Sequence, residues 1–305
     1  MVLINNAFAA ELKEILAPEQ IVFDAPMREH TTFKIGGPAD CLLFPSSFAD
    51  VTAIYKLLAK YDVAVTILGN GSNVLVLDKG IRGAVLKFGP AFADIKREGN
   101  CLRVGAGAML KDVSRYAADC SLSGLEFAIG IPGSIGGAVF MNAGAYDGEM
   151  KMVVTEVKTV TAKGEVRTYT QDKLDFGYRH SVFQDNGEVI CEVVLNLHPG
   201  EPAEISEKME GFTKRRESKQ PLEMPSAGST FKRPAGYYAG TLIDQTGLKG
   251  FNVGGAQISL KHAGFVVNTG NATAADVLNL IKAVQDKVYA KHGVKLYPEV
   301  RIIGE

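Results

Sequence analysis

The chain has 305 residues, of which 46% are hydrophobic and 22% are charged, and its formal net charge is -1 at pH 7. This composition is ordinary for a soluble globular protein, and the length predicts two domains or one elaborate domain. A net charge so close to zero provides no basic field, so we expect neither nucleic acid nor a membrane surface as a partner.

The N-terminal part is predicted to combine strands and helices. Residues 1–20 are expected to form a helical segment, and a second helix is expected to begin after Ser47, because Asp50 completes a sequence resembling a capping box. The apolar residues at positions 51, 54, 57 and 58 fall on one face of that second helix. Strands are predicted at residues 41–44, 63–68, 74–77 and 84–88.

The next segment, residues 91–197, is predicted to be richer in hairpins. Turn residues at 98–100 and 162–165 are flanked by alternating apolar and polar residues, which is typical of antiparallel strands. An amphipathic helix is expected near residues 109–120. Residues 21–197 are therefore predicted to form one domain with two lobes, at about 21–90 and 91–197.

The last third, residues 198–305, is predicted to be a second α+β domain. It begins with a charged helix at 202–218 and contains an apolar strand at 264–268. Thr273 and Asp276 predict the start of a helix that Gly293 ends, and a strand at 294–303 is expected to follow. The fold class expected for the whole chain is α+β.

The spacing of the cysteines and the composition of the N-terminal residues indicate the cellular compartment in which the protein is expected. The four cysteines form no CxxC pair, so neither a zinc site nor a disulfide framework is predicted. Residues 1–10 carry no basic segment before an apolar one, and no run of about 18 apolar residues occurs. We expect a cytoplasmic protein without a membrane span, and without a bound metal because no HExxH motif or Cys/His cluster is present.

The most informative stretch runs from Gly130 to Gly144. It is too glycine-rich for an ordinary helix and too apolar for a flexible linker. We interpret it as a loop that grips a large buried ligand with phosphates, and a tight structural bend is the alternative.

A second glycine loop, Gly69–Asn73, follows a predicted strand. It is not a Rossmann fingerprint, because Val74 stands where the third glycine belongs, and the absence of a Gly-Lys dipeptide excludes a Walker P-loop. Its two glycines expose backbone N–H groups and its side chains add donors, so the loop suits an anion, with a plain turn as the alternative. Together the two loops predict a dinucleotide clamped between two lobes.

Seven motifs in one order carry a family resemblance. The chain resembles the UDP-N-acetylenolpyruvoylglucosamine reductase family over nearly its whole length. The motifs are Thr31–Asp40, Gly69–Asn73, Gly130–Gly137 with Asn142–Gly144, Tyr178–Ser181, Gly228–Lys232, Gly254–Gln257 and Pro298–Val300.

The resemblance implies a two-lobed FAD-binding domain of the PCMH (vanillyl-alcohol-oxidase-like) type and a C-terminal substrate-binding domain. FAD is expected to be non-covalent, because the loop at 69–73 contains no histidine or cysteine. Only Asp185–Glu188 separates the Tyr178–Ser181 motif from the next strand, as in the family's shorter form, type II. The FAD-binding residues implied are Gly69, Asn70, Gly71, Ser72, Asn73, Gly130, Ile131, Pro132, Gly133, Ser134, Gly136, Gly137, Asn142 and Ala143.

The implied reaction is the NADPH-dependent reduction of the enolpyruvyl ether of UDP-N-acetylglucosamine through FAD, in peptidoglycan precursor synthesis. By resemblance Arg179 grips the substrate carboxylate, Glu299 donates a hydrogen bond as a protonated acid, and Ser229 protonates the carbanion. From the residues alone these would be a surface arginine, an edge-strand carboxylate and a turn serine.

Four further residues match family positions that hold the diphosphate and sugar. They are Tyr178, Lys232, Arg233 and Gln257, and at position 233 the family often has asparagine instead. His180, the only histidine within a motif, is interpreted as structural. The alternatives are an FAD-dependent oxidase of the same fold acting on another substrate, and a nucleotide-sensing module without catalysis. A monomer is expected.

Overall fold

The computed structural model describes residues 4–305, so residues 1–3 of the predicted N-terminal helical segment lie outside the described residues. The chain divides into two compact units, each assembled from separate stretches. Unit 1 comprises Met1–Phe23, Asp40–Asn70 and Gly83–Arg215, and unit 2 comprises Asp24–Ala39, Gly71–Arg82 and Arg216–Glu305. Both units contain helices and strands, which confirms the α+β class.

The units differ from the domains predicted by chain order. Residues 24–39 and 71–82 belong to the same compact unit as residues 216–305, rather than to the first lobe, and residues 198–215 belong to unit 1. Strand pairing explains this for residues 71–82, because β4 (Val74–Val76) pairs in parallel with β19 (Arg301–Ile303). Such a long-range pairing leaves no signal in the local sequence pattern.

Unit 1 is built on a five-stranded antiparallel sheet with the order β12-β11-β13-β7-β6. Both predicted hairpins are confirmed, with Gly99 and Asn100 joining β6 to β7 and a turn at 161–165 joining β11 to β12. The strands are β6 (Ile95–Glu98), β7 (Cys101–Gly105), β11 (Val154–Val160), β12 (Val166–Thr170) and β13 (Val189–Asn196).

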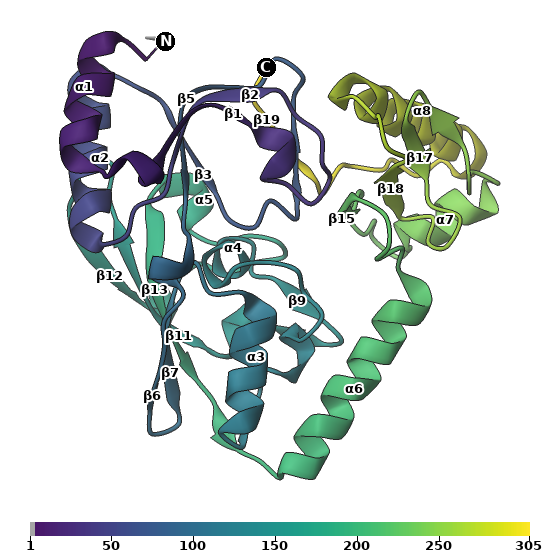
Figure 1. Cartoon of the computed structure of the whole chain (residues 1–305). Helices are drawn as coiled ribbons and strands as arrows, with labels where there is room; N and C mark the ends of the chain where they lie inside the picture. Colours follow the sequence, from purple (N-terminus) through teal and green to yellow (C-terminus); the bar gives the residue numbers. More distant parts are fainter. Residues whose placement is uncertain (1–3) are drawn as a thin grey trace. The chain divides into compact units, whose positions relative to one another are not determined.

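Each face of this sheet contributes to a core of unit 1. The helices α3 (Leu110–Asp119) and α4 (Ile135–Phe140) pack on one face (Figure 1), where Val104 and Val193 are fully buried. Val189 and Cys191 alternate with Ile190 along β13 and join a different core, which contains side chains of α1 (Asn6–Ile15) and α2 (Phe48–Tyr61). This alternation is the period-two pattern of a strand buried on both faces.

The helix α2 confirms its predicted cap. The Oγ of Ser47 accepts a hydrogen bond from the backbone N–H of Asp50, and the predicted apolar face is buried. The strand that follows starts at Val65 instead of Val63, because the N–H of Val63 still donates to the carbonyl of Leu58 at the end of the helix. A four-stranded sheet has the order β1-β2-β5-β3, with β1 (Ile21–Pro26), β2 (Pro38–Leu43), β3 (Val65–Leu68) and β5 (Ile81–Lys87).

Unit 2 is built on the antiparallel sheet β15-β18-β17-β16 and two helices. Thr273 and Asp276 form the predicted capping box of the long helix, and Gly293 ends it in the left-handed region at φ 68°. The elements are β15 (Ser226–Ser229), α7 (Ala239–Gln245), β16 (Asn252–Val253), β17 (Ala256–Ile258), β18 (Phe265–Asn268) and α8 (Ala274–His292).

The predicted closing strand at 294–303 is wrong in its extent. Only Arg301–Ile303 forms a strand, and Pro298 makes an isolated bridge with Phe231. Proline has no backbone N–H to donate to a ladder, which explains why regular pairing does not run through this position.

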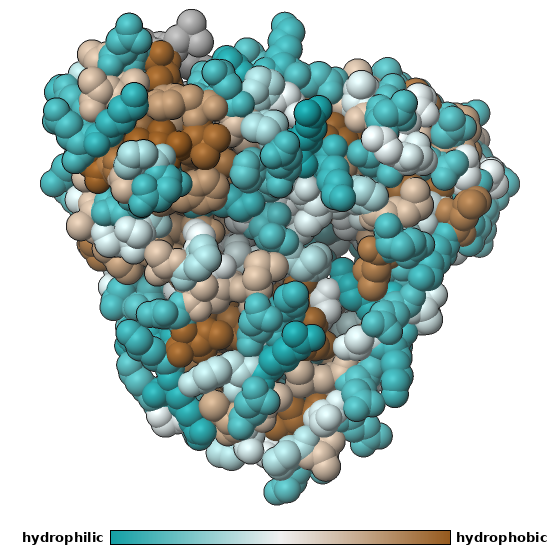
Figure 2. Space-filling model, viewed as in Figure 1, coloured by the Kyte–Doolittle hydropathy of each residue, from teal (hydrophilic) through white to brown (hydrophobic). Residues whose placement is uncertain are grey.

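The helix α6 (Pro202–Lys219) confirms the predicted charged helix. Ile205 is its only buried residue, and the side of the helix seen in Figure 2 is hydrophilic. No helix within residues 4–305 combines the length and apolar character that crossing a bilayer requires. The remaining short elements are β8 (Leu122–Ser123), β9 (Gly144–Ala145), β10 (Gly148–Glu149), α5 (Phe183–Asn186) and β14 (His198–Pro199).

Candidate active site

In unit 1 the first part of one glycine loop lies against the other glycine-rich stretch. The side-chain amide of Asn70 donates to the carbonyl of Pro132 at 2.7 Å. A Cβ built on Gly69 would lie 2.7 Å from the Oγ of Ser134 and 3.7 Å from the Cα of Gly137. Glycine is favoured at position 69, because a side chain there would displace the hydroxyl of Ser134 that caps α4. The structure therefore brings Gly69 and Asn70 together with residues 132–137.

The stretch Gly130–Gly144 is not a loop throughout, which corrects our expectation. Residues Ile135–Phe140 form the helix α4, and the Oγ of Ser134 caps it by accepting from the N–H of Gly137. The N–H groups of Ile135 and Gly136 donate to carbonyls of residues 108 and 106. These tertiary hydrogen bonds offset the weak helix propensity of two consecutive glycines.

Asn142, predicted to bind the cofactor, has its side chain occupied within the protein. The residue is 1% exposed, and its Nδ2 donates to Oε2 of Glu149 at 2.8 Å and to the carbonyl of Gly177 at 2.9 Å. Its Oδ1 accepts from the N–H of Lys151 at 2.9 Å. The side chain of Asn142 thus ties the glycine-rich stretch to the turn at residues 177–180.

That turn carries two predicted substrate residues, Tyr178 and Arg179. Gly177 and His180 exchange backbone hydrogen bonds of 3.1 and 3.2 Å, so Tyr178 and Arg179 form a two-residue connection. Arg179 has φ 54°, a left-handed conformation that side chains other than those of Asn and Asp seldom adopt. Its guanidinium carbon lies 5.5 Å from the ring centroid of Tyr178, which is 60% exposed. Retaining an arginine where glycine would fit better is consistent with a role for its side chain.

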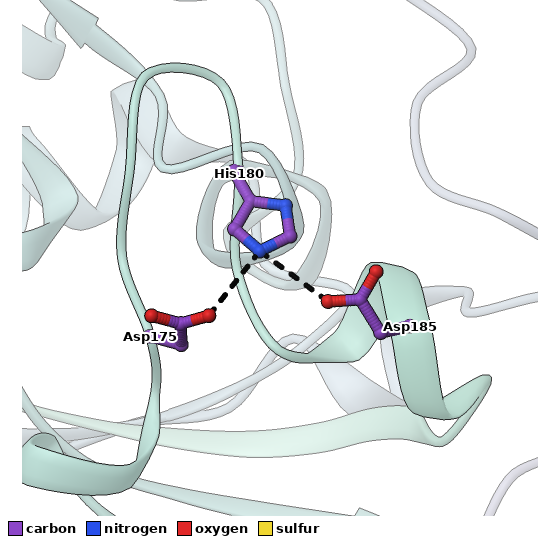
Figure 3. Close-up of side chains that lie close together, drawn as sticks. All are labelled: Asp175, His180 and Asp185. Atoms are coloured by element: carbon purple, nitrogen blue, oxygen red, sulfur yellow. Dashed lines mark ion pairs between the residues drawn. The ribbon is translucent and has the colours of Figure 1, made fainter.

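Three side chains around this turn, one histidine and two aspartates, form a cluster (Figure 3). The Nε2 of His180 lies 3.6 Å from a carboxylate oxygen of Asp175 and 3.4 Å from one of Asp185, and its ring points between the two carboxylates. The two aspartate side chains are 80% and 67% exposed. The three residues lie on both sides of Arg179 in the sequence, and the structural interpretation of His180 stays a prediction.

In unit 2 Ser229 ends a bulged strand. Ser226 pairs with Val267 and Ser229 with Phe265, so β15 has one extra residue, and Gly228 adopts φ 74°. A bulge of this kind redirects the side chains that follow it. Ser229 is exposed, whereas the neighbouring Thr230 is 3% exposed and its Oγ1 accepts from the N–H of Val266.

Glu299 lies beside Ser229 in the fold, although it is distant in sequence. The N–H of Glu299 donates to the carbonyl of Thr230 at 2.8 Å. Asn73 joins the same place, because its Nδ2 donates to the carbonyl of Glu299 at 3.4 Å and its own carbonyl accepts from Arg301. The structure therefore brings Ser229, Glu299 and Asn73 together within unit 2. The carbonyl of the neighbouring Ser72 lies 3.8 Å from a Cβ built on Gly228.

The other residues of unit 2 predicted to bind FAD or the substrate include Gly71, Arg233 and Gln257, and each of these three contacts a nearby residue of the same unit. The carbonyl of Gly71 accepts from the N–H of Thr32. The guanidinium of Arg233 lies over the ring of Tyr238, 4.1 Å from its centroid, and both side chains are exposed. Lys232 is also exposed, and the Nε2 of Gln257 donates to the carbonyl of Gly250.

Two residues near these sites were missed by sequence reasoning. Gln184 bonds to the carbonyl of Arg179 in unit 1, and no sequence motif signals it. In unit 2 burial lowers the pKa of His262, helped by Lys249 and Lys219, and its Nδ1 accepts from the N–H of Gly264. The ring of His262 packs edge-on against Phe265, the pairing partner of Ser229.

Comparisons with known proteins agree with this arrangement. Residues 39–170 match a family model described as FAD binding domain, and residues 220–303 match UDP-N-acetylenolpyruvoylglucosamine reductase, C-terminal domain. The UDP-N-acetylenolpyruvoylglucosamine reductase of Clostridium perfringens (strain 13 / Type A) is 52% identical to this chain and covers 96% of each sequence. The same enzyme of Syntrophomonas wolfei is 47% identical over 97% of this chain and 99% of its own.

Solved structures give the same result. UDP-N-acetylenolpyruvylglucosamine reductase from Thermus caldophilus has a TM-score of 0.81 and 37% identity, covering 93% of this chain and 98% of its own. Alkyldihydroxyacetonephosphate synthase, at 18% identity and TM-score 0.51 over 64% of this chain and 42% of its own, shares the fold alone. The predicted fold class is confirmed, and the chain belongs to the UDP-N-acetylenolpyruvoylglucosamine reductase family.

Proposed function

We propose that this protein reduces UDP-N-acetylenolpyruvoylglucosamine to UDP-N-acetylmuramate, using NADPH as the electron source and FAD as the carrier, in peptidoglycan precursor synthesis. The observation that carries the proposal is 52% identity over 96% of the chain to a protein named for this reaction. The match to an FAD binding domain over residues 39–170 supports the cofactor.

The residues of unit 1 fit a bound FAD. Gly69 lies near Gly137 and the hydroxyl of Ser134, and the absence of side chains at both glycines leaves backbone that a phosphate or a flat ring could approach. Residues 130–134 and Ala143 border the same helix. When bound, FAD supplies a carrier that takes a hydride from NADPH and passes it to a carbon atom of the substrate. No histidine or cysteine lies in the loop at 69–73, so the proposed attachment is non-covalent.

Reduction of the substrate needs a proton and charge stabilisation besides the hydride, and three side chains are proposed to provide them. As hydride reaches the vinyl group of the substrate, negative charge develops on the adjacent carbon and spreads into the carboxylate. Arg179 is proposed to bind that carboxylate through two parallel hydrogen bonds. Ser229 is proposed to deliver the proton that completes the saturated product, and Glu299 to donate a hydrogen bond to the charged intermediate.

The rest of the substrate is a nucleotide sugar with two negative phosphates. Lys232 and Arg233 are proposed to bind the diphosphate, since both are exposed cations on adjacent positions of unit 2. Tyr178 and Gln257 are proposed to contact the sugar portion. We further propose a monomeric, cytoplasmic enzyme.

The test is visible spectroscopy of the purified protein under anaerobic conditions. We expect a yellow protein that NADPH bleaches and that the enolpyruvyl nucleotide then returns to yellow, with one molecule of NADPH consumed for each molecule of product. A protein that stays colourless with added FAD contradicts the proposal. Bleached protein that oxygen reoxidises rapidly, but that the enolpyruvyl nucleotide does not, indicates an oxidase instead.

A further inference from the structure

Gln184 lies on the short helix α5 and bonds directly to the backbone of Arg179. Its Nε2 donates to the carbonyl of Arg179 at 2.8 Å and to the carbonyl of Phe140 at 2.9 Å. Phe140 is the last residue of α4, the helix within the glycine-rich stretch. A side-chain amide nitrogen carries two hydrogens, so it can serve both carbonyls, and the sulfur of Met141 lies farther from it at 3.8 Å.

The backbone of Arg179 needs such a restraint. Its φ of 54° is a left-handed conformation that is unfavourable for an ordinary residue, and it persists only where neighbouring groups hold it. If the residue relaxed to a negative φ, its carbonyl and its side chain would both point elsewhere. A hydrogen bond to that carbonyl therefore favours the one backbone state that sets the direction of the guanidinium.

The neighbouring residues fasten the rest of the turn to the same helix. The Oγ of Ser181, which is fully buried, donates to the carbonyl of Phe140 at 2.8 Å. The Nδ2 of Asn142 donates to the carbonyl of Gly177 at 2.9 Å. The bond from Gln184 reaches the carbonyl of Arg179 itself.

We infer that Gln184 is a positioning residue for Arg179: it holds the left-handed turn against the end of α4 so that the guanidinium has one fixed direction for the substrate carboxylate. This inference rests on the proposed role of Arg179. Gln184 itself touches no reacting atom, so its removal is expected to slow the step in which the substrate is reduced and to spare the step in which NADPH is oxidised.

The first experiment measures both steps by anaerobic stopped-flow absorbance in the holoenzyme. For Gln184→Ala we expect bleaching by NADPH within about twofold of wild type, and reoxidation by the enolpyruvyl nucleotide slowed about tenfold, the effect of losing roughly one net hydrogen bond. Gln184→Glu replaces the donor by an acceptor facing two carbonyls, so it should be slowed at least as much. Equal activity of Gln184→Glu and wild type would overturn the inference, because shape alone would then suffice.

Gln171→Ala is the matched control. The Nε2 of Gln171 also donates to a backbone carbonyl in unit 1, that of Lys151 at 3.0 Å, but it does not contact the turn. We expect wild-type rates for both steps. If Gln184→Ala fails to retain FAD, Gln184→Met keeps the length of the side chain without its donor and takes its place. Loss of FAD from both variants overturns the inference, since Gln184 would then be a residue of the general fold.

A double-mutant comparison separates positioning from general destabilisation. In an Arg179→Ala background, Gln184→Ala should change the reoxidation rate by less than about twofold, because its target is already absent. An undiminished tenfold effect in that background overturns the inference while leaving the proposed role of Arg179 intact. If Arg179→Ala alone reoxidises at the wild-type rate, the proposed role of Arg179 fails, and the inference fails with it.

Discussion

The backbone N–H of Glu299 donates to the carbonyl of Thr230 at 2.8 Å, so Glu299 is fixed beside the residue that follows Ser229. Two side chains with proposed roles in protonation are thus positioned by main-chain bonds between segments far apart in the sequence. The hydroxyl of Ser229 takes no part in this pairing and the residue is exposed, so it can be replaced with little expected loss of structure. A variant at Ser229 therefore reports on chemistry more than on stability.

Ser229→Ala is expected to separate the two half-reactions. Bleaching by NADPH should stay close to the wild-type rate, because hydride transfer to the cofactor needs no proton from the serine. Reoxidation by the enolpyruvyl nucleotide should slow by at least about 100-fold, the scale for losing one acid catalyst. Anaerobic stopped-flow absorbance measures both rates, and an equal loss in the two steps would show that the role assigned to Ser229 is wrong.

Gly228→Ala is expected to disturb the bulge that turns Ser229 outward. Gly228 has φ 74°, where an alanine costs about 1–2 kcal/mol, although the nearest atom to its Cβ would be 3.8 Å away. We expect the free energy of unfolding to fall by about that amount, with reoxidation slowed as well.

Gly293→Ala provides the control for this variant. Gly293 ends α8 at φ 68° with open space around it, so the cost in unfolding free energy should be similar. Urea denaturation measures the stability of both variants. If Gly293→Ala slows reoxidation as much as Gly228→Ala does, the effect is one of stability and not of the bulge.

Asn142→Asp is expected to be strongly destabilising. The substitution places a carboxylate oxygen where Nδ2 now donates to Glu149 and Gly177, at a position 1% exposed. Two lost hydrogen bonds and a buried repulsion predict a fall of at least about 2–3 kcal/mol in the free energy of unfolding, together with weaker FAD binding.

Asn196→Asp is the matched control for that change. Asn196 is exposed on β13, and its Oδ1 acts as an acceptor that an aspartate retains. Its unfolding free energy should stay within about 0.5 kcal/mol of wild type by urea denaturation. Similar losses of unfolding free energy at positions 142 and 196 would indicate that the hydrogen bonds of Asn142 stabilise the protein no more than those of an exposed asparagine.

His262 predicts a pH dependence of stability. Burial lowers its pKa below the ordinary value of 6.5, so the unfolded chain takes up the proton first as the pH falls. Stability that is present above pH 6.5 is therefore lost progressively between that value and the lowered pKa of the folded protein. The Tm of the wild type should fall between pH 7.5 and pH 5.5, and part of this fall belongs to His262.

His262→Asn tests this, because its Oδ1 can still accept from the N–H of Gly264 but cannot take up a proton. The variant should lose some stability at pH 7.5 with the aromatic contact to Phe265, and its Tm should fall less on acidification. Differential scanning calorimetry at the two pH values measures the slopes. Parallel slopes for variant and wild type would show that His262 binds the same number of protons in the folded and unfolded states, which contradicts a lowered pKa.

Local signals predicted the elements whose structure depends on neighbouring residues. The caps at Ser47 and Thr273 and the turn after Glu98 are each decided by chemistry within four residues, and all three are present. The resemblance of the motifs to one family added the fold and the reaction.

Long-range contacts decided the features that were not predicted. The helix α4 forms despite its glycines because carbonyls of residues 106 and 108 bond to it. The bulge at Gly228 exists only in pairing with β18, and the contact of Gln184 with Arg179 depends on how α5 folds back on the turn. The local sequence pattern carries no information on which residues form these tertiary contacts, so these contacts could not be predicted from it.

The parallel pairing of β4 with β19 constrains how this protein is made. Residues 74–76 are synthesised well before residues 301–303, with which they pair. Until then β4 has an unpaired edge that is open to chaperones or to a neighbouring nascent chain. Completion of this part of the molecule must therefore await the synthesis of residues 301–303, and a premature stop codon before residue 301 would leave β4 without its partner.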